Sequence, residues 1–97
     1  MKLYHTFTIG KYYLEGGGAC PEQYDVFIKD EGKLVGYLRL RHGQFTVESP
    51  SCGGNLLYAT NTPKGDGCFE DEERDEFLNI AIKAIDKHLE LNYEQRD

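Results

Sequence analysis

The sequence predicts an α+β domain, in which an antiparallel four- to five-stranded meander sheet carries one C-terminal amphipathic helix packed on one face. Apolar and polar residues alternate through the first half of the chain, and turn dipeptides separate the alternating runs. Apolar residues then recur at helical spacing between Phe77 and Leu89. Strands followed by one helix favour this class. Because the 97 residues show no break in composition, we expect a single α+β domain over residues 1–97.

The first predicted strand covers residues 3–14, where Leu3, Phe7 and Ile9 share one face. Gly10 is expected to mark a bend or a bulge within this strand. The stretch "EGGGACPE" that follows is expected to be a flexible loop, because glycines have no side chains to pack and Pro21 has no N–H donor.

Three further strands form the predicted meander. "QYDVFIKD" and "KLVGYLRLRH" are joined through "DEG", where Gly32 can adopt a positive φ, so these runs predict a hairpin. His42 and Gly43 offer a second tight turn into "QFTVES". "NLLYAT" is a candidate for a fifth strand, and the turn residues of "NTPKGDG" follow it.

Alternation along the meander assigns its side chains to two faces. Those expected to face the helix are Tyr24, Val26, Ile28, Leu34, Leu38, Leu40, Phe45 and Val47. Those expected to point away are Phe27, Lys29, Tyr37, Arg39, Arg41, Thr46 and Glu48. One helix covers one face, so Phe27, Tyr37, Arg39 and Arg41 are predicted to form a ligand-binding or dimer face.

The predicted helix covers residues 70–91 and begins with an acidic run: Glu70, Asp71, Glu72, Glu73, Asp75 and Glu76. Carboxylates near a helix N-terminus interact favourably with its exposed N–H groups and its dipole. Six acids in seven residues exceed what the dipole needs, so we expect them to form a partner-binding surface for a basic protein surface.

The stretch "KGDGCFEDEERDEF" resembles the second half of a calcium-binding loop, with Gly67 at position six and Glu73 at position twelve. The same register places Thr62 first and Lys64 third, where carboxylate ligands belong. A lysine at a ligand position repels the ion. We therefore expect no calcium site.

The three cysteines, Cys20, Cys52 and Cys68, lie in separate predicted loops. If these loops converged, the thiols could form a Cys3His zinc site with His5 or His42. Structural zinc sites usually contain paired ligands at short spacing, and the chain has no C-x-x-C. Three independent thiols are expected, with no metal and no cofactor.

Composition excludes several classes of function. A net charge of −6 and a pI near 5.0 argue against direct nucleic-acid binding, whose affinity depends on basic side chains. No apolar run is long enough to predict a membrane span, and the N-terminus lacks the pattern of a signal peptide, so a cytoplasmic location is expected. No assembled catalytic motif is visible, and a non-enzymatic role is expected.

The sequence thus predicts a small acidic non-enzymatic protein-interaction module, such as an inhibitor that occupies a basic, nucleic-acid-binding surface of a partner. The alternative is a small-ligand or anion-binding module, which would use the open sheet face and the glycine-rich loops, with Arg39 and Arg41 as its charges. A homodimer through the open face is compatible with both functions.

Overall fold

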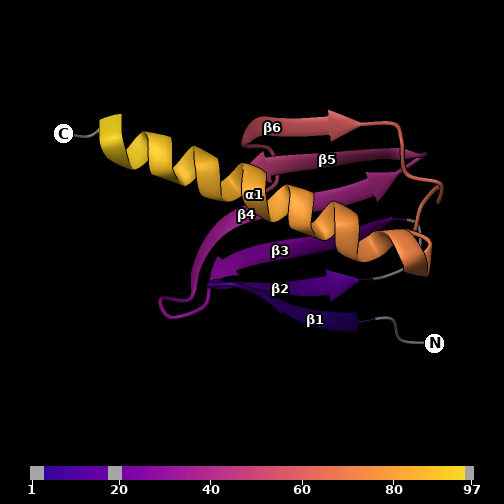
Figure 1. The fold of residues 1–97 in the computed structure, drawn as a ribbon, viewed down its shortest axis with the longest axis horizontal. Helices are drawn as coiled ribbons and strands as arrows, with labels where there is room; N and C mark the ends of the chain where they lie inside the picture. The colour runs from indigo at the N-terminus through magenta and orange to yellow at the C-terminus, as the bar shows by residue number, and fades with distance from the viewer. Residues whose placement is uncertain (1–3, 18–20, 96–97) are drawn as a thin grey trace.

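The computed structural model describes residues 4–17 and 21–95, and within these residues the chain forms six strands followed by one helix (Figure 1). The elements are β1 (Tyr4–Ile9), β2 (Tyr12–Gly17), β3 (Glu22–Ile28), β4 (Lys33–Arg41), β5 (Gln44–Ser49), β6 (Asn55–Thr60) and α1 (Asp71–Gln95). Each strand pairs antiparallel with its neighbour in sequence, which gives the order β1-β2-β3-β4-β5-β6. The predicted α+β class and C-terminal helix are confirmed, whereas the sheet has six strands rather than four or five.

The additional strand arises at Gly10, where the predicted first strand is in fact a hairpin. Ile9 pairs with Tyr12, so Gly10 and Lys11 form a two-residue loop in which Gly10 has a φ of 59°. Glycine with positive φ at the first loop position is the pattern of a type II′ turn, which reverses the chain. β2 also extends into the predicted glycine loop, because the missing side chain of Gly16 lets the Gln23 backbone approach closely. Residues 18–20 lie outside the described part of the chain.

The two predicted turns of the meander are confirmed. Gly32, with a φ of 66°, precedes β4, and its N–H donates to the Ile28 carbonyl at 2.8 Å. His42 and Gly43 form the two-residue connection between β4 and β5, with φ values of 54° and 76°. Two consecutive positive φ values match a type I′ turn, whose twist suits the flanking strands.

A bulge in β4 changes which side chains face the helix. Val26 pairs with Gly36 and Phe27 pairs with Leu34, so Val35 is the extra residue. Val35 is buried in the core, while Leu34 is 36% exposed beside Phe27 on the opposite face. The prediction that Leu34 faces the helix is therefore wrong. The other seven predicted inward residues are buried or partly buried in the core: Tyr24, Val26, Ile28, Leu38, Leu40, Phe45 and Val47.

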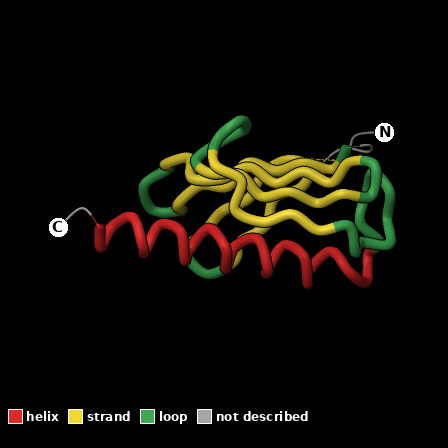
Figure 2. Tube along the Cα trace, turned by 90° about the horizontal axis from the view of Figure 1, so that it is seen from above, coloured by secondary structure: helices red, strands yellow, loops and turns green. Residues whose placement is uncertain are grey.

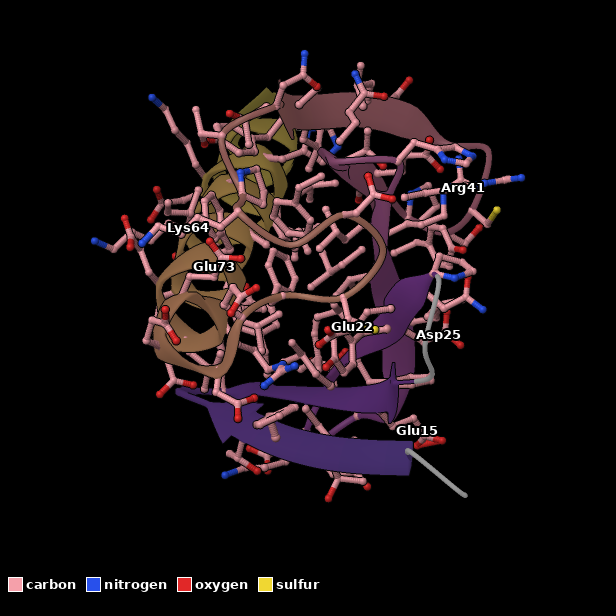
Figure 3. All side chains as sticks on the ribbon, turned by 90° about the vertical axis from the view of Figure 1, so that its right-hand side faces the viewer. Glu15, Glu22, Asp25, Arg41, Lys64 and Glu73 are labelled. Atoms are coloured by element: carbon pink, nitrogen blue, oxygen red, sulfur yellow. The ribbon has the colours of Figure 1, made fainter. Side chains whose placement is uncertain are left out.

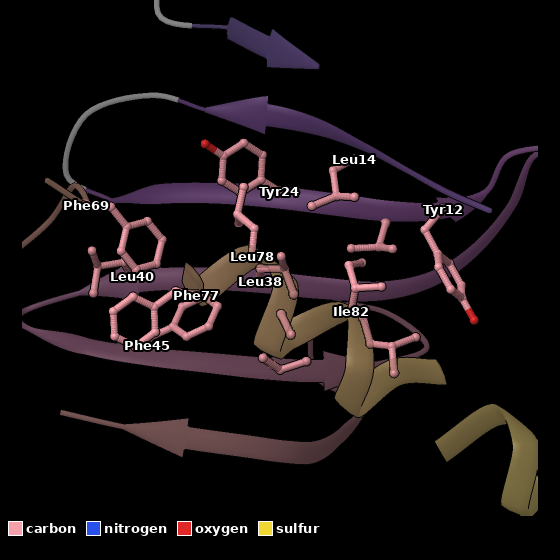
Figure 4. Packing of buried hydrophobic residues seen from close by; sticks show 14 of the residues in the cluster. Tyr12, Leu14, Tyr24, Leu38, Leu40, Phe45, Phe69, Phe77, Leu78 and Ile82 are labelled. Carbon is pink, nitrogen blue, oxygen red and sulfur yellow. The ribbon is translucent and has the colours of Figure 1, made fainter. Parts of the chain in front are cut away.

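Helix α1 lies diagonally across one face of the sheet, and its C-terminal end extends past the strands (Figures 1 and 2). The core fills the space between the two layers (Figure 4). At the end where the helix begins, Phe69 stacks on Phe77 at 5.4 Å between ring centroids, and Phe45 meets both rings edge-on at 5.1 and 5.9 Å. No helix of the described residues covers the face of the sheet turned away from α1, called the outer face below (Figure 2). The turn between β5 and β6 contacts this face, where the Gly53 N–H donates to Glu48 Oε1 at 2.8 Å.

Gly36 lies directly beneath Ile85 of helix α1, and this contact is testable. A Cβ at Gly36 would overlap the Ile85 Cδ1 atom and lie 3.3 Å from its Cγ1. Gly36→Ala should therefore lower the free energy of unfolding by about 1–3 kcal/mol, the usual cost of overpacking. Ile85→Val alone removes Cδ1 and should cost about 0.5–1.5 kcal/mol. In urea unfolding, the double variant should be more stable than the sum of the two costs implies; strictly additive costs would contradict the contact.

Candidate functional site

Glu73 anchors the start of helix α1 to the segment that precedes it. Its side chain is 7% exposed, and Oε1 accepts the N–H of Lys64 at 2.9 Å. Oε2 accepts the N–H groups of Gly65 at 3.0 Å and Glu70 at 2.9 Å. The bond to Glu70 is the returning half of a capping box, in which the third helical residue binds the N-cap N–H. The capping role that the sequence attributes to the whole acidic run is thus performed by this buried carboxylate.

The surroundings of Glu73 stabilise its charged form. Burial by itself would raise the pKa of Glu73, but the backbone N–H groups of Lys64, Glu70 and Gly65, together with the Lys64 charge, hold it below its ordinary value. Both carboxylate oxygens face these donors, so the residue at position twelve of the calcium-loop register points at N–H groups. Within the described residues, no three His, Cys, Asp or Glu side chains gather as a metal site.

A second buried carboxylate, Glu22 on β3, joins the sheet to the helix. Glu22 is 2% exposed, and the guanidinium of Arg74 donates to it through Nε at 2.7 Å and Nη2 at 3.2 Å. The Phe69 N–H donates to Oε1 at 2.9 Å, and the Tyr24 hydroxyl donates to Oε2. This network connects β3, the segment before the helix and the first turn of α1. Glu22 is not predicted from the sequence, because "CPE" reads as a loop and nothing local indicates a partner 52 residues away.

Arg74 also holds Asp71 in place. Its Nη1 donates to Asp71 Oδ1 at 2.8 Å, and Nη2 donates to the Phe69 carbonyl at 3.1 Å. The hydrogen bonds to Glu22, and then that to Asp71, outweigh burial and raise the pKa of the Arg74 guanidinium above its ordinary value. The Asp71 side chain nevertheless stays 96% exposed. The helix start is therefore rigidly held while its outward side chains remain open to solvent.

Five of the six predicted partner-binding carboxylates form an exposed surface. We call this set the acidic surface: Glu70, Asp71, Glu72, Asp75 and Glu76. The sixth, Glu73, points inward toward the segment that carries Lys64 (Figure 3). Glu73 accepts the N-cap N–H of Glu70, while the five carboxylates of the acidic surface are exposed, and the capping role assigned to Glu73 does not explain their charge.

The outer face gathers the four other predicted site residues, in separate rows. Register places Phe27 between Tyr13 and Leu34 at one end of the face. Tyr37 lies in the next row, and its hydroxyl donates to Gln23 Oε1 at 2.6 Å. The structure thus brings the predicted residues onto one face but separates an apolar end from the strand end that carries Arg39 and Arg41.

An acidic row lies between these two ends. Glu15 and Asp25 are directly opposite on β2 and β3, and Glu48 lies across Tyr37 from Asp25. Glu15, Asp25 and Arg41 all project from the side of the sheet away from α1 (Figure 3). Burial, and then the Glu15 charge, raises the pKa of Asp25 above its ordinary value. Carboxylates directly opposite each other destabilise a sheet, a cost that the sequence pattern alone does not reveal.

The cysteines and histidines considered for a zinc site do not gather among the described residues. Cys20 lies in the stretch 18–20, outside the described part of the chain, and the side chain of His5 is likewise not described. Cys52 is exposed in the turn between β5 and β6, and His42 lies in the turn between β4 and β5.

Comparison with known proteins does not extend this picture: no family of proteins, no characterised protein and no solved structure matches the chain. The fold and its surfaces therefore define the class as a six-stranded α+β meander covered on one face by a helix.

The capping role of Glu73 gives a test with a defined pH dependence. At neutral pH, Glu73→Gln should lower the free energy of unfolding by about 1–3 kcal/mol, because buried N–H donors lose an acceptor. Folding lowers the pKa of Glu73 from 4.5, so its ionised form stabilises the protein above that pH. This contribution is lost as the pH falls through the lower folded pKa. Urea unfolding from pH 7 to pH 2 should show the difference between wild type and variant shrinking below pH 4.5.

Glu72→Gln is the matched control for that measurement, since Glu72 is an exposed neighbour on the same helical turn. It should change stability by no more than about 0.3–1 kcal/mol through the helix dipole. Equal costs for the two variants would contradict the capping role of Glu73.

Proposed function

We propose that this chain is a non-enzymatic protein-interaction module whose acidic surface binds a basic surface of a partner protein. A nucleic-acid-binding channel is one such surface, and a protein that occupied it would act as an inhibitor. The observation that carries the proposal is the division of roles at the helix start, where Glu73 caps and Arg74 anchors. The five carboxylates of the acidic surface remain exposed around them. A surface patch of one charge sign attracts a partner surface of the opposite sign and raises the rate at which the two proteins associate.

The rigidity of this region supports the proposal. Glu22 and Arg74 fix the first turn of α1 to β3, and Glu73 fixes it to the backbone of Lys64 and Gly65. A surface that is already ordered loses little conformational entropy on binding, so more of the interaction energy appears as affinity.

A cytoplasmic location is part of the same proposal. The exposed thiol of Cys52 suits a reducing compartment. No helix in the described part of the chain combines the length and the apolarity that crossing a bilayer requires.

Charge reversal on the acidic surface tests the proposal. The variant Glu72→Lys, Asp75→Lys, Glu76→Lys leaves the capping residue, the Asp71–Arg74 pair and the N-cap intact. Its net charge rises from −6 to 0. We expect it to lose a basic partner captured by pull-down and identified by mass spectrometry from the source cell. Binding of that partner to the wild type should weaken with rising salt, because salt screens the charges.

The matched control is Asp30→Lys, Glu31→Lys, Glu90→Lys, which alters exposed carboxylates outside the acidic surface by the same net charge. It should retain the partner. Both variants need unfolding curves, since a reversed charge in the first helical turn costs about 0.3–1 kcal/mol. If the folded helix variant still binds, or if salt has no effect, the acidic surface is not the binding site.

The outer face supports a second contact, with another copy of this chain. Leu34 is 36% exposed there beside Phe27, Tyr37 lies in the next row, and Leu56 is 61% exposed on β6, across Glu48 from Tyr37. An apolar patch of this kind often marks a contact surface, and a twofold axis would pair it with itself.

Sedimentation provides the test of this homodimer. Wild type should sediment at about twice its chain mass of 11.1 kDa, and Tyr37→Glu should return it to the monomer by placing a charge in the contact. Asn79→Glu, on the exposed side of α1, should leave the dimer intact. A monomeric wild type would contradict the dimer.

A further inference from the structure

A hollow of about 470 Å³ opens on the outer face beside the turn between β4 and β5. Its lining comes from β4, β5, the turn and the segment after β6: Arg39, Arg41, His42, Gln44, Thr46 and Asn61. Guanidinium, imidazole, amide and hydroxyl groups all offer hydrogen-bond donors. No carboxylate lines the hollow, although the chain has 17 acidic residues and 11 lysines and arginines.

The two arginines of the hollow keep their donors available. Among the described residues, the ion pairs involve Lys11 and Arg74, and neither Arg39 nor Arg41 is paired with a carboxylate. Arg74 offers the contrast, because its guanidinium donates to two carboxylates and a carbonyl. Arg39 and Arg41 are two residues apart on one strand, so both project from the same face.

The turn that carries His42 is fixed in position. The Gly43 N–H donates to the Asp66 carbonyl at 2.6 Å, which ties the turn to the same segment that supplies Asn61. His42 has a φ of 54°, a value that glycine or asparagine adopts more readily. The Asp66 carboxylate lies near Gly43 but is not part of the lining. The backbone of the turn beside the hollow is thus fixed before any ligand arrives.

We propose that this hollow binds the phosphate group of a small organic phosphate. Arginine presents a planar fork of donors that matches a phosphate oxyanion in two bonds, and two adjacent arginines can bind one such group together. The volume falls within the range of small-molecule sites and exceeds what a lone phosphate ion fills. The site is separate from the acidic surface on α1, so either can be tested without the other.

Titration with pyrophosphate tests the site, with nuclear magnetic resonance of backbone amides as the readout. At constant ionic strength, pyrophosphate should produce saturable shifts in the amides of residues 39–46 and of Asn61. Arg39→Gln and Arg41→Gln should each raise the dissociation constant at least tenfold. Lys29→Gln and Lys33→Gln remove the same charge near the opposite hairpin and should leave the constant unchanged.

Three outcomes would overturn the proposal. One is the absence of saturable shifts with pyrophosphate. Another is equal weakening by the lysine variants, which would show non-specific attraction to positive charge. The third is succinate binding as tightly as pyrophosphate, which would contradict the assignment to phosphate. The acidic-surface variant should bind pyrophosphate like the wild type, so that a failure here is distinct from a failure of the proposed protein partner.

Discussion

The carboxylate of Glu22 is an ion held almost wholly away from water, and the position of helix α1 depends on it. Removing a charge from water costs several kcal/mol, and the cost is offset only when its oxygens are well satisfied. Arg74, the Phe69 N–H and the Tyr24 hydroxyl together donate the hydrogen bonds that satisfy the Glu22 oxygens. These groups come from α1, the segment before it and β3, so the ion is satisfied only when all three are in place. Phe69 is thereby held where it can stack on Phe77.

The segment 61–70 has no regular secondary structure, yet it makes hydrogen bonds to the sheet, to helix α1 and to the turn between β4 and β5. Gly67 accepts the N–H of Glu22 at 2.7 Å, and Asp66 accepts that of Gly43 at 2.6 Å. The Lys64 and Gly65 N–H groups of this segment donate to the Glu73 carboxylate. A side chain at Gly65 would collide with the Cys68 carbonyl. One irregular segment therefore positions both the acidic surface on the helix side and the turn beside the hollow on the outer face.

Local patterns predicted the features of this fold that local forces determine. The turns at Gly32 and His42–Gly43 could be predicted because few residue types tolerate positive φ, and α1 could be predicted from its apolar spacing. The hairpin at Gly10 was mistaken for a bent strand, although its two-residue loop moves the inward positions from odd numbers (Phe7, Ile9) to even numbers (Tyr12, Leu14), a change that a continuous strand would not show. The bulge at Val35 follows from register and from close packing at Gly36, which no single strand encodes.

The buried carboxylates of the candidate site likewise could not be predicted from local sequence patterns. Glu73 and Glu72 are neighbours of one residue type, but one is buried against three N–H donors and the other is exposed. Helical position and the path of the preceding segment decide between them. Glu22 is a stronger case, because its partner is 52 residues further along the chain. The composition of the acidic surface was therefore predictable, whereas the carboxylates that hold it in place were not.

The order of the strands has a consequence for how the chain folds. Every strand pairs with its neighbour in sequence, so the sheet has low contact order and can assemble hairpin by hairpin, without closing a long loop first. The ribosome, however, releases residues 71–95 after all six strands of the sheet. Until then the inner face of the sheet, with Leu14, Val26 and Leu38, has no covering layer. Synthesis therefore passes through a stage in which an apolar sheet awaits its helix, and that stage is the one most exposed to misassociation with other chains.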